Sequence, residues 1–367
     1  MNFKQIILFF FISVLFFSCE KDVADDSENN QDFNRSELLL NWSDNIIIPA
    51  YDDFYSSLID LEESINMFTE TPSVDLLATL SEFWLDSYKI WQHIEMFDIG
   101  LAEVINYKGK MNIYPTDSEL ILQNIESGDY DLNNNNNFDA RGFPALDYMI
   151  HGLAENANEI VDFYISYPSY SDYLSNLISA MIYNTNLIIQ DWSVYRDDFL
   201  NSTDNTATSS VNKMTNDFIF YFEKGLRANK IGIPAGIFST DPLPTTVEAY
   251  YKQDVSKDLA LEALLATKNF FSGKHYNNNL YGNGLSTYLD FISISSDNNL
   301  SELILLQYDE AEIELAQVND NFVYQIETNN NQMLYAYDAI QVLVVSFKVD
   351  MLQALAISVD YVDADGD

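Results

Sequence analysis

The chain has 367 residues, of which 57 are acidic and 17 are basic, so its formal net charge is −40. A surface with this charge repels nucleic acid and anionic lipid, and the composition therefore excludes nucleic acid as a partner. Apolar residues make up 47% of the chain, which excludes disorder over its whole length. The length is enough for two domains of ordinary size.

The first residues have the pattern of a cleaved export signal. Lys4 precedes an apolar run over 6–17, which is too short to span a bilayer and typical of a signal peptide. A serine and then Cys19, the only cysteine, follow the run, as at a lipoprotein cleavage site. We predict a signal peptide over 1–18, a lipidated Cys19 that anchors the chain to a membrane, and a disordered tether over 19–35. The expected location is the outer membrane, at the cell surface or the periplasmic face, and the alternative is an ordinary cleaved signal with an unmodified cysteine.

Apolar residues at spacings of three and four predict helices in the first half of the chain. Long apolar stripes cover 36–70, 76–97 and 168–198, and shorter helices are expected near 116–126 and 143–152. Pro49 lies inside the first stripe and should kink or restart that helix, because proline has no backbone N–H. The rest of 105–142 is expected to be irregular.

A segment rich in serine and threonine over 202–210 is typical of a linker. It divides the chain into a predicted N-terminal helical bundle over 36–201 and a C-terminal helical bundle over 211–367. Period-two alternation does not persist anywhere, so the predicted fold class is all-α. In the second half we expect an irregular loop over 230–236 and helices over 210–227, 247–272, 284–294, 298–317 and 329–358.

The segment Arg141–Gly152 carries the residues with the clearest chemistry. Gly142 permits an unusual backbone conformation, and Pro144 fits the first turn of a helix, where a missing N–H costs nothing. Asp147 and His151 follow at i and i+4, which puts a carboxylate and an imidazole on one helix face, where they could share a cation. The alternative is that Asp147 stabilises a helix end and that His151 is a surface residue.

This segment resembles the Gly-x-His-x-x-Glu motif of imelysin-like proteins, the family of the insulin-cleaving metalloprotease and of iron-regulated outer-membrane proteins. Pro144 stands at the histidine position and Asp147 at the glutamate position. The resemblance implies two four-helix bundles packed side by side, with the motif near their junction, and a link to iron. Further stretches similar to the family are 45–51, the tryptophan-rich stretch 84–100, 114–117, 230–234, 247–248, 347–350 and 363–367.

Candidate metal ligands are mostly carboxylates, because the chain has three histidines and no His-Glu-x-x-His helix. We predict a site formed by Asp147, His151, Glu95 and Asp117. A carboxylate-dominated set favours harder cations, such as iron or another divalent cation. No phosphate-binding loop, nucleophile elbow or Cys-His pair occurs, so the sequence gives no support for nucleophilic catalysis.

The predicted function is that of an imelysin-like envelope lipoprotein that is not an enzyme. It would bind a metal, an iron-containing ligand or a partner protein in iron acquisition, with envelope proteins of metal uptake as partners. Peptidase activity is not expected, since Pro144 has no donor to replace the motif histidine. Two alternatives stay open: a metallopeptidase that uses Asp147, His151 and a third acid, and an interaction scaffold with a degenerate site.

Overall fold

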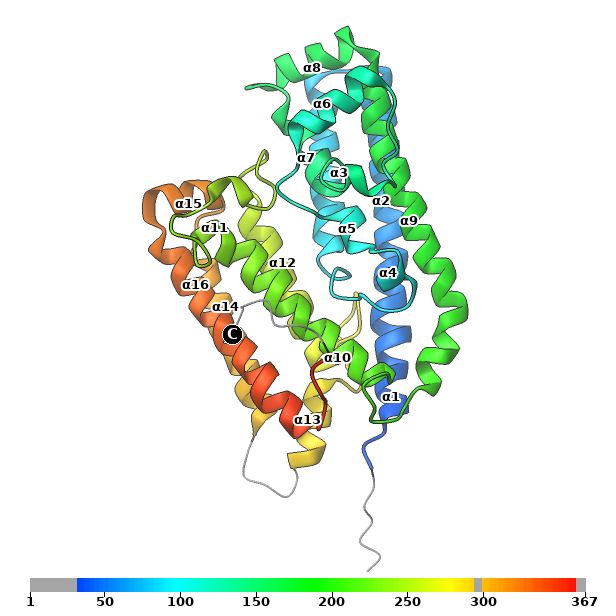
Figure 1. Ribbon diagram of the computed structural model, residues 1–367, viewed down its shortest axis with the longest axis vertical. Coiled ribbons are helices and arrows are strands. Elements are labelled where there is room, and N and C mark those ends of the chain that lie inside the picture. The colour runs from blue at the N-terminus through cyan, green and yellow to red at the C-terminus, as the bar shows by residue number, and fades with distance from the viewer. Residues whose placement is uncertain (1–31, 294–298, 361–367) are drawn as a thin grey trace, which may run out of the picture. The chain divides into compact units, whose positions relative to one another are not determined.

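A computed structural model describes residues 32–293 and 299–360, and the elements within those ranges are helices (Figure 1). No strand occurs in this part of the chain, where the β-pairing is limited to an isolated bridge between Lys274 and Tyr281. The prediction of an all-α fold is therefore confirmed.

The chain divides into two units, Met1–Asp32 and Phe33–Asp367, and the helices belong to the second unit. The predicted signal peptide, Cys19 and most of the tether lie outside the described residues, as do residues 363–367. In the part that is described, no helix is both long enough and apolar enough to cross a membrane.

Three long helices form the centre of the first half of the chain, α2 (Ile48–Glu70), α3 (Val74–Trp91) and α9 (Pro168–Asn201). Helix α2 lies between the other two and contacts both (Figure 1). The three stripes predicted from the apolar spacing correspond to these helices. The shorter elements of this half are α1 (Arg35–Leu40), η1 (Asn41–Ile47), α4 (Leu101–Val104), α5 (Lys108–Met111), α6 (Ser118–Ser127), η2 (Asn135–Asn137), α7 (Gly142–Asp147), η3 (Tyr148–Gly152) and α8 (Ala157–Ser166).

In the second half, α12 (Ser256–Ser272), α14 (Leu300–Ala316), α16 (Asn331–Val345) and the π-helix η4 (Tyr221–Gly232) pack on one another (Figure 1). Segment 202–209 joins α9 to the first helix of this half without forming a helix. The domain boundaries and the side-by-side arrangement of two four-helix bundles stay predictions. The remaining elements are α10 (Ser210–Phe220), α11 (Ile233–Ala235), η5 (Pro244–Thr246), α13 (Leu285–Ser293), α15 (Phe322–Asn329), η6 (Ser346–Met351) and α17 (Leu352–Ala354).

Aromatic side chains link the two halves of the chain in one apolar core. Trp42 of η1 stacks on Phe270 of α12 with ring centroids 4.8 Å apart, and Phe97 lies 5.7 Å from the same ring. On the other side, Tyr88 of α3 and Phe143 of α7 stack at 4.3 Å with an interplanar angle of 3°. Full burial of one such ring contributes about 1.5–3 kcal/mol, so this core fixes the helices that carry the polar sites.

Two local predictions are wrong, and a third concerns the helix around Pro49. Residues 230–236 are not an irregular loop, because η4 and α11 continue the helical path until Gly236, which has a φ of 83°. Residues 247–255 are not helical, because Ala249 has a φ of 57° and two backbone N–H groups of this segment bond to Asp147 instead of to a helix. At Pro49, where a kink or restart is predicted, η1 ends at Ile47 and α2 begins at Ile48 with no break in the helical backbone, so only the hydrogen-bonding pattern changes, from π-helical to α-helical.

Candidate functional site

The motif segment forms a short helix, as predicted, with α7 followed directly by the π-helix η3. Gly142 begins α7 with a φ of 74°, and a Cβ at this position would lie 2.1 Å from the backbone oxygen of Met111. Only glycine fits such a conformation and such a close approach. Pro144 is buried in the first turn of α7, where its missing N–H leaves no bond unmade.

The Asp147 carboxylate is buried and already has three donors. Its exposed fraction is 1%. Its Oδ2 accepts a hydrogen bond from the backbone N–H of Tyr251 at 2.8 Å, and its Oδ1 accepts one from the backbone N–H of Lys252 at 3.0 Å. The Nδ1 of His151 lies 2.9 Å from the same Oδ1. A buried carboxylate is stable only when it is paired, and these contacts provide the partners. Through them Asp147 connects the motif helix to a segment of the second half of the chain.

His151 continues this chain of contacts to a serine. Its Nε2 lies 2.8 Å from the Oγ of Ser81, and Trp84 packs edge-on against its ring at 5.0 Å. The chain of contacts thus runs from a serine through a histidine to an aspartate, as in a hydrolase triad. Ser81, however, lies in the interior of α3, where backbone N–H groups already bond within the helix and form no oxyanion hole. We interpret the chain of contacts as one that positions His151 and Asp147.

A cavity of about 200 Å³ lies beside the motif. Pro144, Asp147 and the segment 114–116 form part of its wall, and residues between 245 and 251 form the rest. Pro144 offers no polar hydrogen to this space, and the carboxylate oxygens of Asp147 are both occupied by donors. The motif cavity therefore presents few groups that are free to hold a ligand.

A second polar cluster surrounds Glu95, in the turn that follows α3. Lys230 places its Nζ 2.7 Å from both carboxylate oxygens of Glu248 and 3.7 Å from the Oε2 of Glu95. The Nδ2 of Asn112 donates to the Oε1 of Glu95 at 3.1 Å and to the Oε1 of Glu248 at 2.9 Å, and its Oδ1 accepts from the Tyr88 hydroxyl at 2.6 Å. One lysine ammonium thus lies near two carboxylates in the protein interior, where the burial of charged groups is unfavourable.

Glu95 is the member of this cluster that is not fully satisfied. Its Oε2 is buried and accepts no hydrogen bond of normal geometry from the described residues, although the Lys230 ammonium lies 3.7 Å away and the hydroxyl of Tyr221, which lines the same cleft, interacts with this carboxylate. Burial raises the pKa of the Glu95 carboxyl, the Lys230 ammonium lowers it in part, and the Glu248 carboxylate raises it again. The side chain is 12% exposed, so it reaches the edge of the protein interior while the lysine and Glu248 stay inside.

Glu95 faces a cleft of about 190 Å³ that has further carboxylates on its walls. Asp98, which pairs with Lys108, and Asp217 of α10 both line this cleft. Burial raises the pKa of Asp217 to about 8, and the carboxylates of Asp98 and Asp360 contribute to the rise. At neutral pH this cleft therefore holds a protonated carboxyl that a bound cation would ionise.

The structure brings together two of the four predicted metal ligands. Asp147 and His151 are hydrogen-bonded, whereas Glu95 belongs to the cluster with Lys230. Asp117 is exposed and caps α6, where its Oδ1 accepts from the backbone N–H of Leu120 at 3.0 Å. Within residues 32–293 and 299–360, no group of three or more His, Cys, Asp or Glu side chains is placed to hold a metal ion. A metal site formed by these four residues stays a prediction.

Sequence reasoning missed the partners of Glu95. Lys230 and Glu248 stand out in the sequence only as family landmarks, and Asn112 and Asp217 carry no local signal. These residues come from four separate segments, and only the tertiary fold brings them into contact. Lys230 and Glu248 have both polar and apolar sequence neighbours, so the local sequence does not mark these two residues as buried.

In the described ranges, the fold and these sites define an all-helical protein in which polar groups from both halves of the chain meet in buried clusters. The family model described as Imelysin matches residues 47–347, and the chain belongs to this family. The resemblance inferred from the motif is therefore confirmed.

Solved structures agree with this assignment. A proposed iron-regulated protein A precursor from Parabacteroides distasonis ATCC 8503 is similar with a TM-score of 0.70 and 17% identity, over 86% of this chain and 94% of the other. An imelysin-like protein from Psychrobacter arcticum 273-4 is similar with a TM-score of 0.69 and 16% identity, over 89% of this chain and 97% of the other. At these identities the likeness shows the fold. No curated protein matches the chain at a significant level.

Proposed function

We propose that this protein is an envelope lipoprotein of the imelysin family that binds a cation-bearing ligand in the cleft at Glu95 and does not cleave peptide bonds. Iron that keeps some ligands of its own is the cation we favour. The chain would supply carboxylate contacts from Glu95, Asp98 and Asp217, and the lipid on Cys19 would hold the protein at the outer membrane, at the cell surface or on the periplasmic face.

The Oε2 of Glu95, which accepts no hydrogen bond and has only the Lys230 ammonium at 3.7 Å, is the observation that carries this proposal. A buried carboxylate oxygen that accepts no hydrogen bond is unfavourable, the distant Lys230 ammonium offsets only part of this cost, and a cation in the cleft would offset more of it. Asp217 adds a second carboxyl group. Burial opposes its ionisation, whereas a bound cation would favour its ionisation. Because the three carboxylates do not form a ready-made coordination shell, a bare ion is a poorer fit than an ion that brings ligands.

The motif residues support a role in binding over a role as a peptidase. A catalytic zinc ion needs about three protein ligands and an open position. Both oxygens of Asp147 and both ring nitrogens of His151 already have partners in the protein. A metal ion could use these groups only if it displaced the contacts that fasten the segment 250–252.

The link to iron and to the envelope comes from outside the cleft. The Parabacteroides neighbour is described as iron-regulated, and the same context for this chain is part of the proposal. The cleft contributes the chemistry, since carboxylate oxygens are suitable ligands for hard cations. Envelope proteins of metal uptake would be the partners that deliver or receive the ligand.

The test is a calorimetric titration of the mature chain with ferric citrate and, without oxygen, with ferrous ion. We expect binding that releases about one proton near pH 7, because the cation ionises Asp217, whose pKa is about 8 in the free protein. Buffers with different ionisation enthalpies would reveal that proton. The variants Glu95→Gln and Asp217→Asn should each weaken binding by about tenfold or more, since each removes one carboxylate contact.

Asp60→Asn is the control, because it replaces a carboxyl group at an exposed position on α2. It should leave the affinity unchanged. Equal weakening by Asp60→Asn would mean that iron responds to the general negative charge, and the cleft would then lose its assigned role. Degradation of a test protein in a chelator-sensitive manner would instead support the metallopeptidase alternative.

A further inference from the structure

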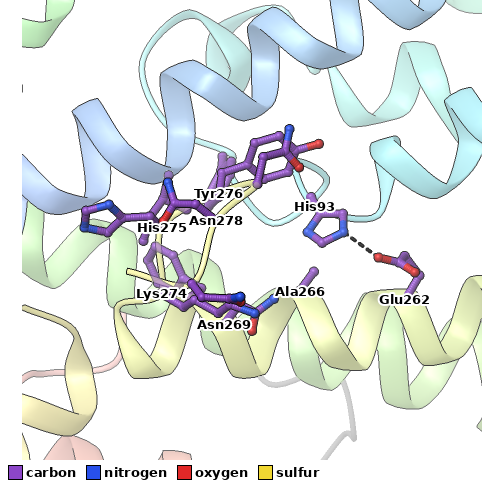
Figure 2. A pocket seen from close by; sticks show the side chains of 13 residues that line it. His93, Glu262, Ala266, Asn269, Lys274, His275, Tyr276 and Asn278 are labelled. Atoms are coloured by element: carbon purple, nitrogen blue, oxygen red, sulfur yellow. Dashed lines mark hydrogen bonds and ion pairs between the residues drawn. The ribbon is translucent and has the colours of Figure 1, made fainter. Parts of the chain in front are cut away.

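A further cavity, of about 320 Å³, is lined by His93 of the turn that carries Glu95 and by Phe97, whereas Glu95 itself lines the cleft described above. It lies between α12, the turn after α3 and the loop 274–279 (Figure 2). Figure 2 shows Lys274 and Asn269 on one side, Tyr276 and Asn278 of the loop on the other, and the His93–Glu262 pair at one end. Its size falls in the range that holds a small organic molecule.

The loop that forms one wall is fastened to the first half of the chain. Pro49 has no N–H to give to the backbone oxygen of Asn45, four residues earlier, and that oxygen accepts the backbone N–H of Tyr276 at 2.8 Å instead. The side chain of Asn41 donates to the backbone oxygens of Gly273 and Asn283, both at 2.9 Å. The cavity therefore has a fixed wall and does not depend on a mobile loop.

The carboxylates near this cavity already have donors. Glu262 pairs with the Nε2 of His93 at 2.6 Å. Asp53 accepts the hydroxyl of Tyr276 at 2.6 Å and the Nδ2 of Asn277 at 3.2 Å. Neither acid needs a ligand to satisfy it.

The donors on the walls are free by contrast. Among the described residues, the Lys274 ammonium makes no ion pair, and the side-chain amides of Asn269 and Asn278 donate to no protein oxygen. An unpaired lysine is notable in a chain in which acidic residues outnumber basic ones by 57 to 17. A cavity with free donors and occupied carboxylates selects a ligand that accepts hydrogen bonds and carries negative charge.

The remaining wall is apolar. Ile46, Phe97, Ala266 and Phe270 line the cavity, and each is at most 6% exposed. Such a surface gains from contact with a hydrocarbon ring or chain, which inorganic phosphate does not have. The two histidines cannot share a metal ion, because the ring of His275 lies at the other end of the cavity from His93 (Figure 2).

From these contacts we infer that the cavity is a binding site for a small organic anion, whose carboxylate meets Lys274, Asn269 and Asn278 and whose apolar body packs on Phe97 and Phe270. The site is separate from the cleft at Glu95 and does not depend on the function proposed there. It adds to that function a ligand of opposite charge.

Three probes separate charge from shape. 2-Naphthoate carries a carboxylate on an aromatic body, 2-naphthamide has nearly the same shape without the charge, and inorganic phosphate has charge without the body. In titrations of the mature chain we expect naphthoate to bind, and naphthamide and phosphate each to bind at least about tenfold more weakly. Equal binding of naphthoate and naphthamide, or tighter binding of phosphate, would overturn the inference.

Two variants locate the probe. Lys274→Met removes the positive charge and keeps the aliphatic stem. Asn269→Asp introduces a negative charge in a side chain of the same shape. Each variant should weaken the binding of naphthoate by about tenfold or more and leave the binding of naphthamide unchanged. Lys224→Met and Asn229→Asp are matched controls, because those residues line the other cleft. Equal loss in the controls would contradict the site. If Lys274→Met lowers the melting temperature so far that the variant does not fold, the binding measurements on Asn269→Asp alone test the site.

Discussion

Asp217 shows how burial sets the charge of a single residue. In the unfolded chain an aspartate has a pKa near 3.8, whereas burial raises the pKa of Asp217 in the folded chain to about 8. Between these values the folded state holds a proton that the unfolded state has lost. The stabilising contribution of this group is therefore fully present below about pH 4 and is lost as the pH rises through about 8.

Asp217→Asn should remove this pH dependence, because asparagine copies the shape of the protonated acid without titrating. As the pH rises from 5 to 8, the free energy of unfolding of the variant should increase relative to that of the parent chain, by up to about 1.4 kcal/mol per pH unit. Urea unfolding at several pH values measures the free-energy difference. Asp52→Asn, at an exposed site on α2, should keep a constant offset from the parent over the same range. A constant offset for Asp217→Asn as well would show that this carboxyl titrates normally.

At this scale the sequence predicts what helical periodicity controls. Asp147 and His151 are one turn apart, so their contact followed from the spacing alone. The contact of Glu95 with Lys230 spans more than a hundred residues and depends on how separate helices pack. No local pattern encodes such a pair, which is why Glu95 was placed with Asp147 and not with Glu248.

Among the elements, apolar spacing predicted the long helices and missed the places where the backbone serves another segment. The stripe over 36–70 became α1, η1 and α2, because its apolar face is continuous through Pro49. Residues 247–255 also have an apolar pattern, yet their N–H groups bond to Asp147 and Ala249 takes a left-handed conformation. The tertiary hydrogen bonds to Asp147 outweigh the weak local preference of this segment for a helix, so no helix forms there.

The start of α7 offers a test of how tightly an element boundary is built. Gly142→Ala should lower the free energy of unfolding by about 2–4 kcal/mol, because a left-handed conformation is costly for alanine and the new Cβ would meet the Met111 backbone oxygen. Gly128→Ala is the control, since Gly128 has a similar φ of 64° and open space around its Cβ. That variant should cost only about 1 kcal/mol. Equal losses would show that the contact with Met111 relaxes freely.

Across the whole molecule, three kinds of contact join the first and second halves of the chain. The stacking of Trp42 on Phe270 is apolar, the pairing of Lys230 with Glu95 is ionic, and the bonds of Asp147 are to backbone N–H groups. The apolar and ionic contacts tolerate small shifts, whereas two backbone donors on one carboxylate require a defined register. Asp147 therefore fixes the segment that leads from Glu248 to α12.

This role predicts a local effect of Asp147→Asn that a metal ligand alone would not produce. An amide group cannot accept both backbone donors, so the N–H groups of Tyr251 and Lys252 should exchange with solvent about ten times faster or more, and unfolding should become easier by about 1–3 kcal/mol. Hydrogen exchange followed by mass spectrometry, without added metal, measures both amides in peptides that cover the segment. Asp44→Asn is the control, because it removes a carboxylate paired with Arg196 inside the first half. Unchanged protection of the 250–252 peptides in Asp147→Asn would mean that the segment is held in place by its other contacts, and the carboxylate would then be available for a ligand.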